Sequence, residues 1–230
     1  MSERLQSATY FPPVETALRD PNGLLAMGGD LSVERLLDAY RHGIFPWFNP
    51  DEPILWWSPD PRMVLVPGEV RVTRSLAKRM RNGGFELRVD TAFADVMRAC
   101  AEPREDAGGT WISLAMIAAY TRLFDAGHAH SVETWHDGKL VGGLYGVAIG
   151  RMFYGESMFS READASKVAL VRLARQLQAW GFGLIDCQME TEHLASLGAH
   201  TMPRAAFTAR LTELVNLPHC PGPWHFDAPD

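Results

Sequence analysis

The chain carries the sequence FYGESMFS at residues 153–160 and the sequence LIDCQM at residues 184–189, and these two stretches decide its fold. Both predict short strands. Each holds a carboxylate, Glu156 or Asp186, at a position where a core strand normally has an apolar side chain. Two readings stay open at this point: the carboxylates line a functional cleft, or they are structural groups with solvent or a buried partner.

Side chains of a strand point alternately to its two faces, and this alternation predicts which of them share a cleft. Tyr154, Glu156 and Met158 are expected to share one face of the first strand. Asp186 and Gln188 are expected to share one face of the second strand, with the cysteine between them pointing away. The predicted cleft is therefore lined by two carboxylates, a methionine and an amide.

The neighbouring residues predict how the two strands are joined. Strands separated by tight turns form an antiparallel meander at 131–135, 140–148 and 152–158. A helix capped by Ser166 then runs to about Trp180 and leads into the strand at 184–189. Because strand, helix and strand in this order form a crossover, the two carboxylate strands are expected to be parallel neighbours.

The predicted fold class is α/β, with a mixed α+β sheet, and the order of its elements resembles the acetyltransferase superfamily, a GNAT-like fold. In that plan two neighbouring parallel strands separate to form an acyl-transfer cleft. The loop at 159–165, which would cradle the pyrophosphate of coenzyme A, has no glycine and carries Glu162 and Asp164. A backbone phosphate cradle needs glycine for close approach, so we expect an acyl donor other than coenzyme A.

The first part of the chain differs in amino-acid composition from the rest. Residues 1–62 are rich in turn formers and aromatics, and they predict one clear helix, with Ser32 as its cap and Gly43 as its stop. Strand patterns begin near residue 63. We therefore predict a small N-terminal domain at 1–62 and a GNAT-like domain at 63–230.

The composition excludes several classes of protein. The chain has 230 residues, of which 47% are hydrophobic and 22% charged, with a formal charge of -6 and three cysteines without CxxC spacing. No run approaches the roughly 18 apolar residues of a membrane span. We expect a cytoplasmic monomer with reduced thiols. His128 and His130 lack a third ligand nearby, so we predict no metal and no cofactor.

Three cationic side chains with helical spacing follow the predicted domain boundary near residue 63. Arg74, Lys78 and Arg81 follow an i, i+4, i+7 pattern that places them on one face of a helix. A solvated face is the common explanation of such a row. Because the chain as a whole is acidic, this face is also a candidate contact for phosphate.

Several motifs together resemble those of the bacterial leucyl/phenylalanyl-tRNA protein transferase family, in order and spacing, over roughly residues 11–204. The motifs are PNGLLAMGGDL at 21–31, GIFPWF at 43–48, PILWWSPDPR at 53–62, GHAHS at 127–131, GESMFS at 155–160, LIDCQ at 184–188 and ASLGA at 195–199. The resemblance implies transfer of Leu or Phe, and sometimes Met, from aminoacyl-tRNA to a protein that begins with Arg or Lys. The product is an N-degron for protein degradation.

The resemblance also implies roles for the catalytic candidates. In the family, the position of Asp186 is thought to draw a proton through Gln188 from the attacking amine, and that of Glu156 to hold the donor aminoacyl group. Two rival functions stay open: a coenzyme A dependent N-acetyltransferase and a non-catalytic tRNA-binding module.

Further positions correspond to the family's substrate contacts. By this resemblance, the pocket for the donor side chain is lined by Met158, Phe153, Leu144 and Leu170. The terminal adenosine is contacted by Trp47 and Trp111, with Tyr120 beside them. The tRNA phosphates are contacted by Arg74, Lys78 and Arg81. Strand alternation places Phe153 opposite Glu156, so Phe153 lines the same pocket only if the strand twists or bulges.

Overall fold

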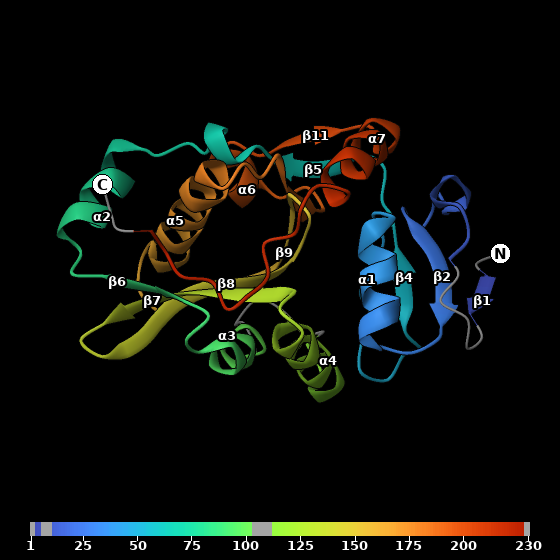
Figure 1. The fold of residues 1–230 in the computed structure, drawn as a ribbon, viewed down its shortest axis with the longest axis horizontal. Coiled ribbons are helices and arrows are strands. Elements are labelled where there is room, and N and C mark those ends of the chain that lie inside the picture. Colours follow the sequence, from blue (N-terminus) through green and yellow to red (C-terminus); the bar gives the residue numbers. More distant parts are fainter. Residues whose placement is uncertain (1–2, 6–10, 103–111, 228–230) are drawn as a thin grey trace.

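Two β-sheets and the helices around them make up the molecule, as a computed structural model describes it for residues 3–5, 11–102 and 112–227 (Figure 1). The smaller sheet has the strand order β1-β2-β4-β3, with β1 Glu3–Leu5, β2 Leu24–Gly28, β3 Phe45–Pro46 and β4 Leu55–Trp57. Helix α1, Val33–Arg41, packs beside it. A 3₁₀ turn at Val14–Thr16 precedes β2.

The larger sheet has seven described strands in the order β11-β5-β10-β9-β8-β7-β6. Their bounds are β5 Arg62–Leu65, β6 Glu86–Val89, β7 Ala129–His136, β8 Lys139–Ile149, β9 Met152–Ser160, β10 Leu184–Gln188 and β11 His200–Met202. The remaining helices are α2 Arg74–Asn82, α3 Phe93–Cys100, α4 Leu114–Asp125, α5 Ala165–Ala179, α6 Glu192–Ser196 and α7 Arg204–Val215, with a 3₁₀ turn at Pro67–Glu69.

The central part of the large sheet has the predicted topology. β7, β8 and β9 pair as an antiparallel meander, and β10 pairs with β9 in parallel, with Asp186 opposite Tyr154. Helix α5 makes the crossover and covers one face of the sheet, whereas α3 and α4 lie on the other (Figure 1). The predicted mixed α/β fold with parallel carboxylate strands is therefore confirmed.

The cap predicted at Ser32 is present, and helix α4 starts with a cap of the same kind at Ser113. The Ser32 hydroxyl accepts the backbone N–H of Arg35, and the Ser113 hydroxyl accepts that of Met116, so each satisfies one free N–H of a first turn. The predicted cap at Ser166 is wrong. Helix α5 begins at Ala165 after Asp164, which has the left-handed φ of 65° and makes no side-chain cap bond.

Two β-bulges overturn the predicted sharing of faces. Ser157 pairs with Tyr145 and Gly155 with Gly146, so Glu156 is an extra residue in β9. Because one inserted residue reverses the alternation, Tyr154 packs in the core on the α3 and α4 side, while Met158 packs on the α5 side. The prediction that Tyr154, Glu156 and Met158 share a face is wrong for this reason.

The second bulge lies in β10, between Asp186 and Gln188. Gln188 has a left-handed φ of 64°, which turns its side chain out of the strand alternation. Asp186 therefore stays in the interior while Cys187 and Gln188 line the cavity described below. The prediction that Asp186 and Gln188 share a face, with Cys187 turned away, is wrong.

The hydrophobic core continues from the small sheet into the large one. Leu36 and Tyr40 of α1 belong to the same buried cluster as Tyr120 of α4 and Tyr154 of β9. The change of sheet falls between the end of β4 at Trp57 and the start of β5 at Arg62. The domains at 1–62 and 63–230 stay a prediction, since one core joins them.

The four strands of the small sheet and the edge strand β11 were not expected from the sequence. These strands have two to five residues and stand among prolines and glycines, so they show no stretch long enough for alternation to be visible. None of the helices that the structure describes is both long and apolar enough to cross a membrane.

Candidate active site

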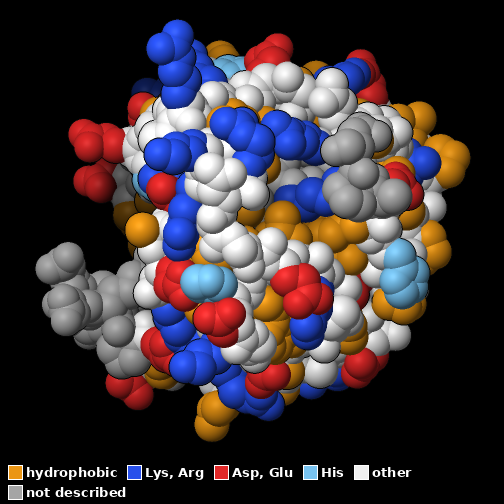
Figure 2. Space-filling model, turned by 90° about the vertical axis from the view of Figure 1, so that its left-hand side faces the viewer, with side chains coloured by type: hydrophobic (Ala, Val, Ile, Leu, Met, Phe, Trp, Pro, Cys, Tyr) orange, Lys and Arg blue, Asp and Glu red, His pale blue; other side chains and the backbone are white. Residues whose placement is uncertain are grey.

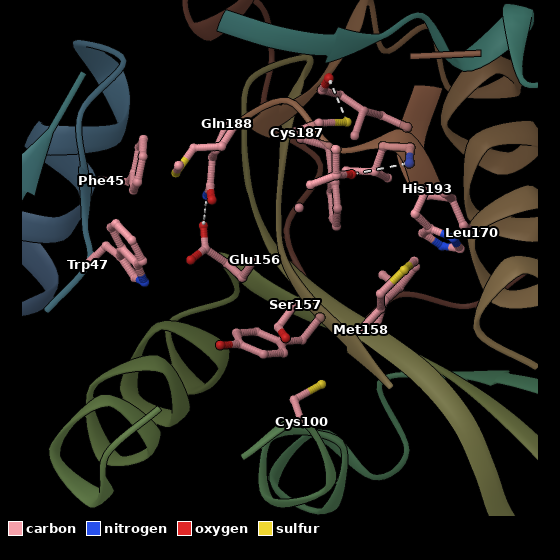
Figure 3. A pocket seen from close by; sticks show the side chains of 18 of the residues that line it. Phe45, Trp47, Cys100, Glu156, Ser157, Met158, Leu170, Cys187, Gln188 and His193 are labelled. Atoms are coloured by element: carbon pink, nitrogen blue, oxygen red, sulfur yellow. Dashed lines mark hydrogen bonds between the residues drawn. The ribbon is translucent and has the colours of Figure 1, made fainter. Parts of the chain in front are cut away.

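A cavity of about 510 Å³ opens beside the two carboxylate strands, where β9 and β10 carry their bulges. Four predicted pocket residues line it together: Leu144, Phe153, Met158 and Leu170. Figure 3 shows Phe45 and Trp47 on one side of the cavity, Met158, Leu170 and His193 on the other, and Glu156 with Gln188 between them. The sequence-predicted pocket is thus assembled from β8, β9 and α5.

The bulge in β9 explains how Phe153 reaches this cavity. With Glu156 inserted, Phe153 and Met158 both pack toward α5 although their numbers differ by five. The condition for Phe153 to share the pocket was a twist or a bulge, and the bulge is present.

Glu156 is the buried carboxylate in the cavity wall, which the exposed Glu102 also lines. It is only 9% exposed, and three side chains hydrogen-bond to it. The Tyr40 hydroxyl donates to Oε1 at 2.7 Å, the Tyr120 hydroxyl to Oε2 at 3.0 Å and the Gln188 amide to Oε1 at 3.0 Å. Burial raises the pKa of Glu156 to about 7, against the lowering effect of the two tyrosines. Glu156 is therefore able to exchange a proton near neutral pH.

Asp186 lies in a different setting, although its strand is the neighbour of β9. It is fully buried, and both of its oxygens accept hydrogen bonds from Arg62, from Nε at 2.8 Å and from Nη2 at 2.6 Å. The Arg62 guanidinium lies between the rings of Phe45 and Phe207. The backbone N–H of Gln188 also donates to Asp186, at 2.8 Å. Asp186 does not line the cavity, and it connects to it through the backbone of Gln188.

The mouth of the cavity is apolar and partly exposed. Trp47 is 39% exposed and Met189 48% exposed, and both line the opening with Phe45. The Trp57 ring packs edge-on against Trp47, and its Nε1 donates to the Trp47 carbonyl at 2.6 Å. This contact holds an exposed aromatic face at the entrance, which is an arrangement suited to stacking.

The other two predicted adenosine contacts are placed differently. Trp111 lies outside the described residues. Tyr120 is fully buried and is not part of the cavity wall; its hydroxyl contacts Glu156 and the hydroxyl of Tyr40. Tyr120 therefore contacts the Glu156 carboxylate from the protein interior and not from the cavity.

The basic face of α2 lies on the side of the molecule seen in Figure 2, where Lys and Arg side chains gather over the surface. Arg74, Lys78 and Arg81 are exposed. Within residues 11–102 and 112–227 no ion pair neutralises these three, whereas Arg79 of the same helix pairs with Glu162. The face therefore presents uncompensated positive charge to solvent.

The remaining candidates from the sequence have structural settings. His130 Nδ1 donates to the Asp90 carboxylate at 2.8 Å and its ring stacks on Trp224, and His128 stacks on His219. In the part of the chain that the structure describes, no three His, Cys, Asp or Glu side chains are placed to hold a metal ion. Burial raises the pKa of the Cys187 thiol, so this thiol stays protonated.

Two residues that shape the site were not singled out from the sequence. Tyr40 falls within the helix predicted between Ser32 and Gly43, and Arg62 is the last residue of the motif PILWWSPDPR. The sequence did indicate that such partners exist, because a carboxylate inside a strand is expected to be buried and a buried carboxylate requires hydrogen-bond donors or a cation. The partners themselves stand more than a hundred residues away, 116 for Tyr40 and 124 for Arg62.

The mixed sheet, its neighbouring parallel strands and the carboxylate-bearing cavity beside them define the class of protein: a mixed α/β fold with a candidate site beside two parallel strands. Among solved structures, the chain is similar to L-PGS from Bacillus licheniformis, with 11% identity, 74% of this chain and 57% of that chain covered, and a TM-score of 0.39. It is also similar to a GCN5-related N-acetyltransferase from Kribbella flavida, with 14% identity, 73% and 59% covered, and a TM-score of 0.36. These weak likenesses carry no argument about function.

Comparison of sequences is far more specific. The model of the leucyl/phenylalanyl-tRNA protein transferase family matches residues 64–212, and that of its N-terminal domain matches residues 29–60. A leucyl/phenylalanyl-tRNA–protein transferase of Thiobacillus denitrificans is 81% identical over 99% of this chain and 100% of its own length. One of Nitrosomonas europaea is 63% identical over 99% and 96%. This chain belongs to the leucyl/phenylalanyl-tRNA protein transferase family, so the predictions of the family and of a transferase enzyme are confirmed.

Proposed function

We propose that this protein transfers Leu or Phe, and also Met, from aminoacyl-tRNA to the α-amine of proteins that begin with Arg or Lys. The product carries a new peptide bond and is an N-degron for protein degradation. The observation that carries the proposal is an apolar cavity with one buried carboxylate, Glu156, in its wall. Aminoacyl esters are activated, so aminolysis proceeds without ATP, metal or cofactor, and positioning supplies most of the acceleration.

The apolar part of the cavity suits the donor side chain. Its volume of about 510 Å³ exceeds that of one Leu or Phe side chain and leaves room for the ester and the sugar. Leu144, Met158 and Leu170 are flexible, unbranched at Cβ, and adapt to side chains of different shape. An apolar pocket separates near-isosteres by only about 1–3 kcal/mol, which accounts for acceptance of Leu, Phe and Met together.

The terminal adenosine is proposed to stack on Trp47 at the cavity mouth. Its exposed ring is held in place by Trp57, so little freedom is lost on binding. Trp111 keeps its predicted role as a second adenosine contact. Tyr120 is proposed to support Glu156 instead, because its ring is buried behind the carboxylate.

The tRNA body is proposed to lie across α2. Arg74, Lys78 and Arg81 present uncompensated charge on one exposed face, which suits the phosphate backbone without reading its sequence. We further propose that the protein works as a cytoplasmic monomer, where charged tRNA and new protein N-termini are both at hand.

Coenzyme A is the less favoured acyl donor. At the start of α5, the N–H of Ala165 donates to the Glu162 carbonyl and the N–H of Ser166 to the Ser160 hydroxyl, both at 3.2 Å. A pyrophosphate would have to displace these bonds beside the carboxylates of Glu162 and Asp164. The helix start is therefore a poor anion cradle.

The test is transfer of labelled Phe from Phe-tRNA to a peptide that begins with Arg. We expect label in the peptide, and none in a matched peptide whose N-terminal amine is acetylated. Binding of Phe-tRNA without any transfer would favour the tRNA-binding module. Acetyl-CoA binding in calorimetry, with acetylation of the peptide, would favour the N-acetyltransferase.

A further inference from the structure

We propose that Glu156 accepts the proton of the attacking amine during transfer, and that Asp186 is a positioning residue. This inference rests on the proposed function and concerns the roles of its two carboxylates. It departs from the sequence-based expectation, in which Asp186 draws the proton through Gln188. The contacts of the two carboxylates separate these roles.

Glu156 has acceptor capacity left beyond its three hydrogen bonds. A carboxylate has about four lone-pair positions, two on each oxygen. On Oε1 they are taken by the hydroxyl of Tyr40 and the amide of Gln188, and on Oε2 one is taken by the hydroxyl of Tyr120. One position on Oε2 stays open in a residue that lines the cavity. Glu156 can therefore receive one more proton donor.

The tyrosines around Glu156 are arranged to take up an additional proton. The hydroxyls of Tyr40 and Tyr120 contact each other as well as the carboxylate, so three oxygen–oxygen contacts form a closed ring. Two hydroxyl protons cannot serve three contacts when Glu156 is ionised. A protonated carboxyl supplies the third proton, so all three contacts of the ring are satisfied when Glu156 is protonated.

Asp186 lacks both the access and the freedom for this step. It is fully buried, its Oδ1 accepts from Arg62 and from the backbone of Gln188, and its Oδ2 accepts from Arg62. The Gln188 amide nitrogen points to Glu156, so the side chain of Gln188 does not join Asp186 to the cavity. Asp186 instead fixes Arg62 and the turn that carries Gln188.

The charge around Glu156 also suits a proton acceptor at neutral pH. The titratable groups that face it are Tyr40 on α1, Tyr120 on α4, Tyr145 on β8 and Asp186 on β10, with Arg62 of β5 opposite Asp186. Burial raises the pKa of Glu156 to about 7 and those of the three tyrosines well above their ordinary values. Of Glu156 and the three tyrosines, Glu156 is thus the group that changes charge near neutrality.

The step balances as follows for a neutral amine. The amine nitrogen forms a bond to the ester carbonyl carbon, and the Glu156 carboxylate takes one proton from that nitrogen. The bond from carbon to the ribose oxygen then breaks, and the proton passes from Glu156 to this oxygen. Glu156 ends as a carboxylate, the tRNA ends with a free hydroxyl, and the peptide bond is complete.

The experiment is a pH–rate profile of Phe transfer under saturating acceptor peptide, for wild type, Glu156→Gln and Asp186→Asn. The wild type should lose rate below an inflection near pH 7, in addition to the titration of the peptide amine near pH 8. Glu156→Gln should lower kcat by about 100-fold or more and lack the lower inflection. The Asp186→Asn variant should transfer Phe more slowly than wild type but keep the lower inflection.

Two further variants identify the group that titrates. Tyr120→Phe removes a donor that stabilises the charged carboxylate, so it should move the inflection to higher pH. Glu133 is also a buried carboxylate with a raised pKa, held by Thr91 and Ser131 outside the cavity, and Glu133→Gln should leave the profile unchanged.

The outcomes are distinct. Absence of any transfer by wild type would refute the proposed function itself. Wild-type transfer with a lower inflection that persists in Glu156→Gln, or vanishes only in Asp186→Asn, would overturn the present inference. A Glu156→Gln variant that raises KM for Phe-tRNA while kcat and profile stay unchanged would also overturn it, because Glu156 would then only hold the donor.

Discussion

Glu156 and Asp186 stand on neighbouring parallel strands, each beside a β-bulge and each removed from solvent, yet their surroundings are opposite. Three neutral donors surround Glu156: two tyrosines and an amide. The Arg62 guanidinium donates a hydrogen bond to each of the two carboxylate oxygens of Asp186. Neutral donors leave the charge of a buried carboxylate free to change, whereas a paired guanidinium compensates it.

Both centres also join the two sheets. Tyr40, which holds Glu156, belongs to α1 beside the small sheet, and Arg62 donates through Nη1 to the carbonyl of Gly43 at 3.1 Å. Residues of the N-terminal part therefore complete both carboxylate settings. The comparison teaches that burial alone does not determine whether the charge of a carboxylate can change. The groups that hydrogen-bond to the carboxylate determine it.

Breaking the Asp186 centre should have the largest effect. Arg62→Met leaves Asp186 buried without its cation, and we expect the free energy of unfolding to fall by about 3–5 kcal/mol, as measured by urea denaturation. Arg88→Met, which breaks an exposed pair with Glu86, is the matched control and should leave the midpoint nearly unchanged. Equal behaviour of the two variants would contradict the difference drawn here.

The Glu156 centre should show itself in the pH dependence of stability. Its pKa in the folded protein is raised from 4.5 to about 7, so folding stability is complete below the unfolded value and is lost as pH rises toward 7. Relative to Glu156→Gln, wild type should lose about 3 kcal/mol of unfolding free energy between about pH 4 and pH 8. Urea denaturation at both pH values measures this. A difference that does not depend on pH would contradict the raised pKa.

The basic face of α2 should act outside both centres. Replacing Arg74, Lys78 and Arg81 by Ala should weaken tRNA binding about tenfold at moderate salt and make the slope of log K against log salt shallower by about 2–3. The pH–rate inflection should stay where it is. An unchanged salt slope in filter binding would remove this face from the tRNA contact.

The smallest expected effect concerns the residue shared by both centres. Gln188→Asn keeps a residue that tolerates the left-handed φ and keeps the backbone bond to Asp186, but it shortens the amide that reaches Glu156. We expect a loss of about 1 kcal/mol in unfolding free energy and a slight upward move of the pH–rate inflection. A loss as large as that of Arg62→Met would mean that the Asp186 centre was disturbed as well.

Local sequence determined much of this protein. The hydroxyl cap at Ser32, the antiparallel meander of β7, β8 and β9, and the crossover to β10 depend on neighbouring residues, so they were visible without coordinates. The motif series also identified the family, and the four side chains that it implies for a donor pocket line one cavity.

Only the tertiary structure decided the surroundings of the two carboxylates at 156 and 186. Each bulge shifts the alternation after one inserted residue, which separated Gln188 from Asp186 and brought Phe153 and Met158 to one cavity. Tyr40 and Arg62 reach their carboxylates across 116 and 124 residues of chain. Alternation is a local property, whereas the partner of a buried charge is set by how distant segments pack, and no local pattern encodes that choice.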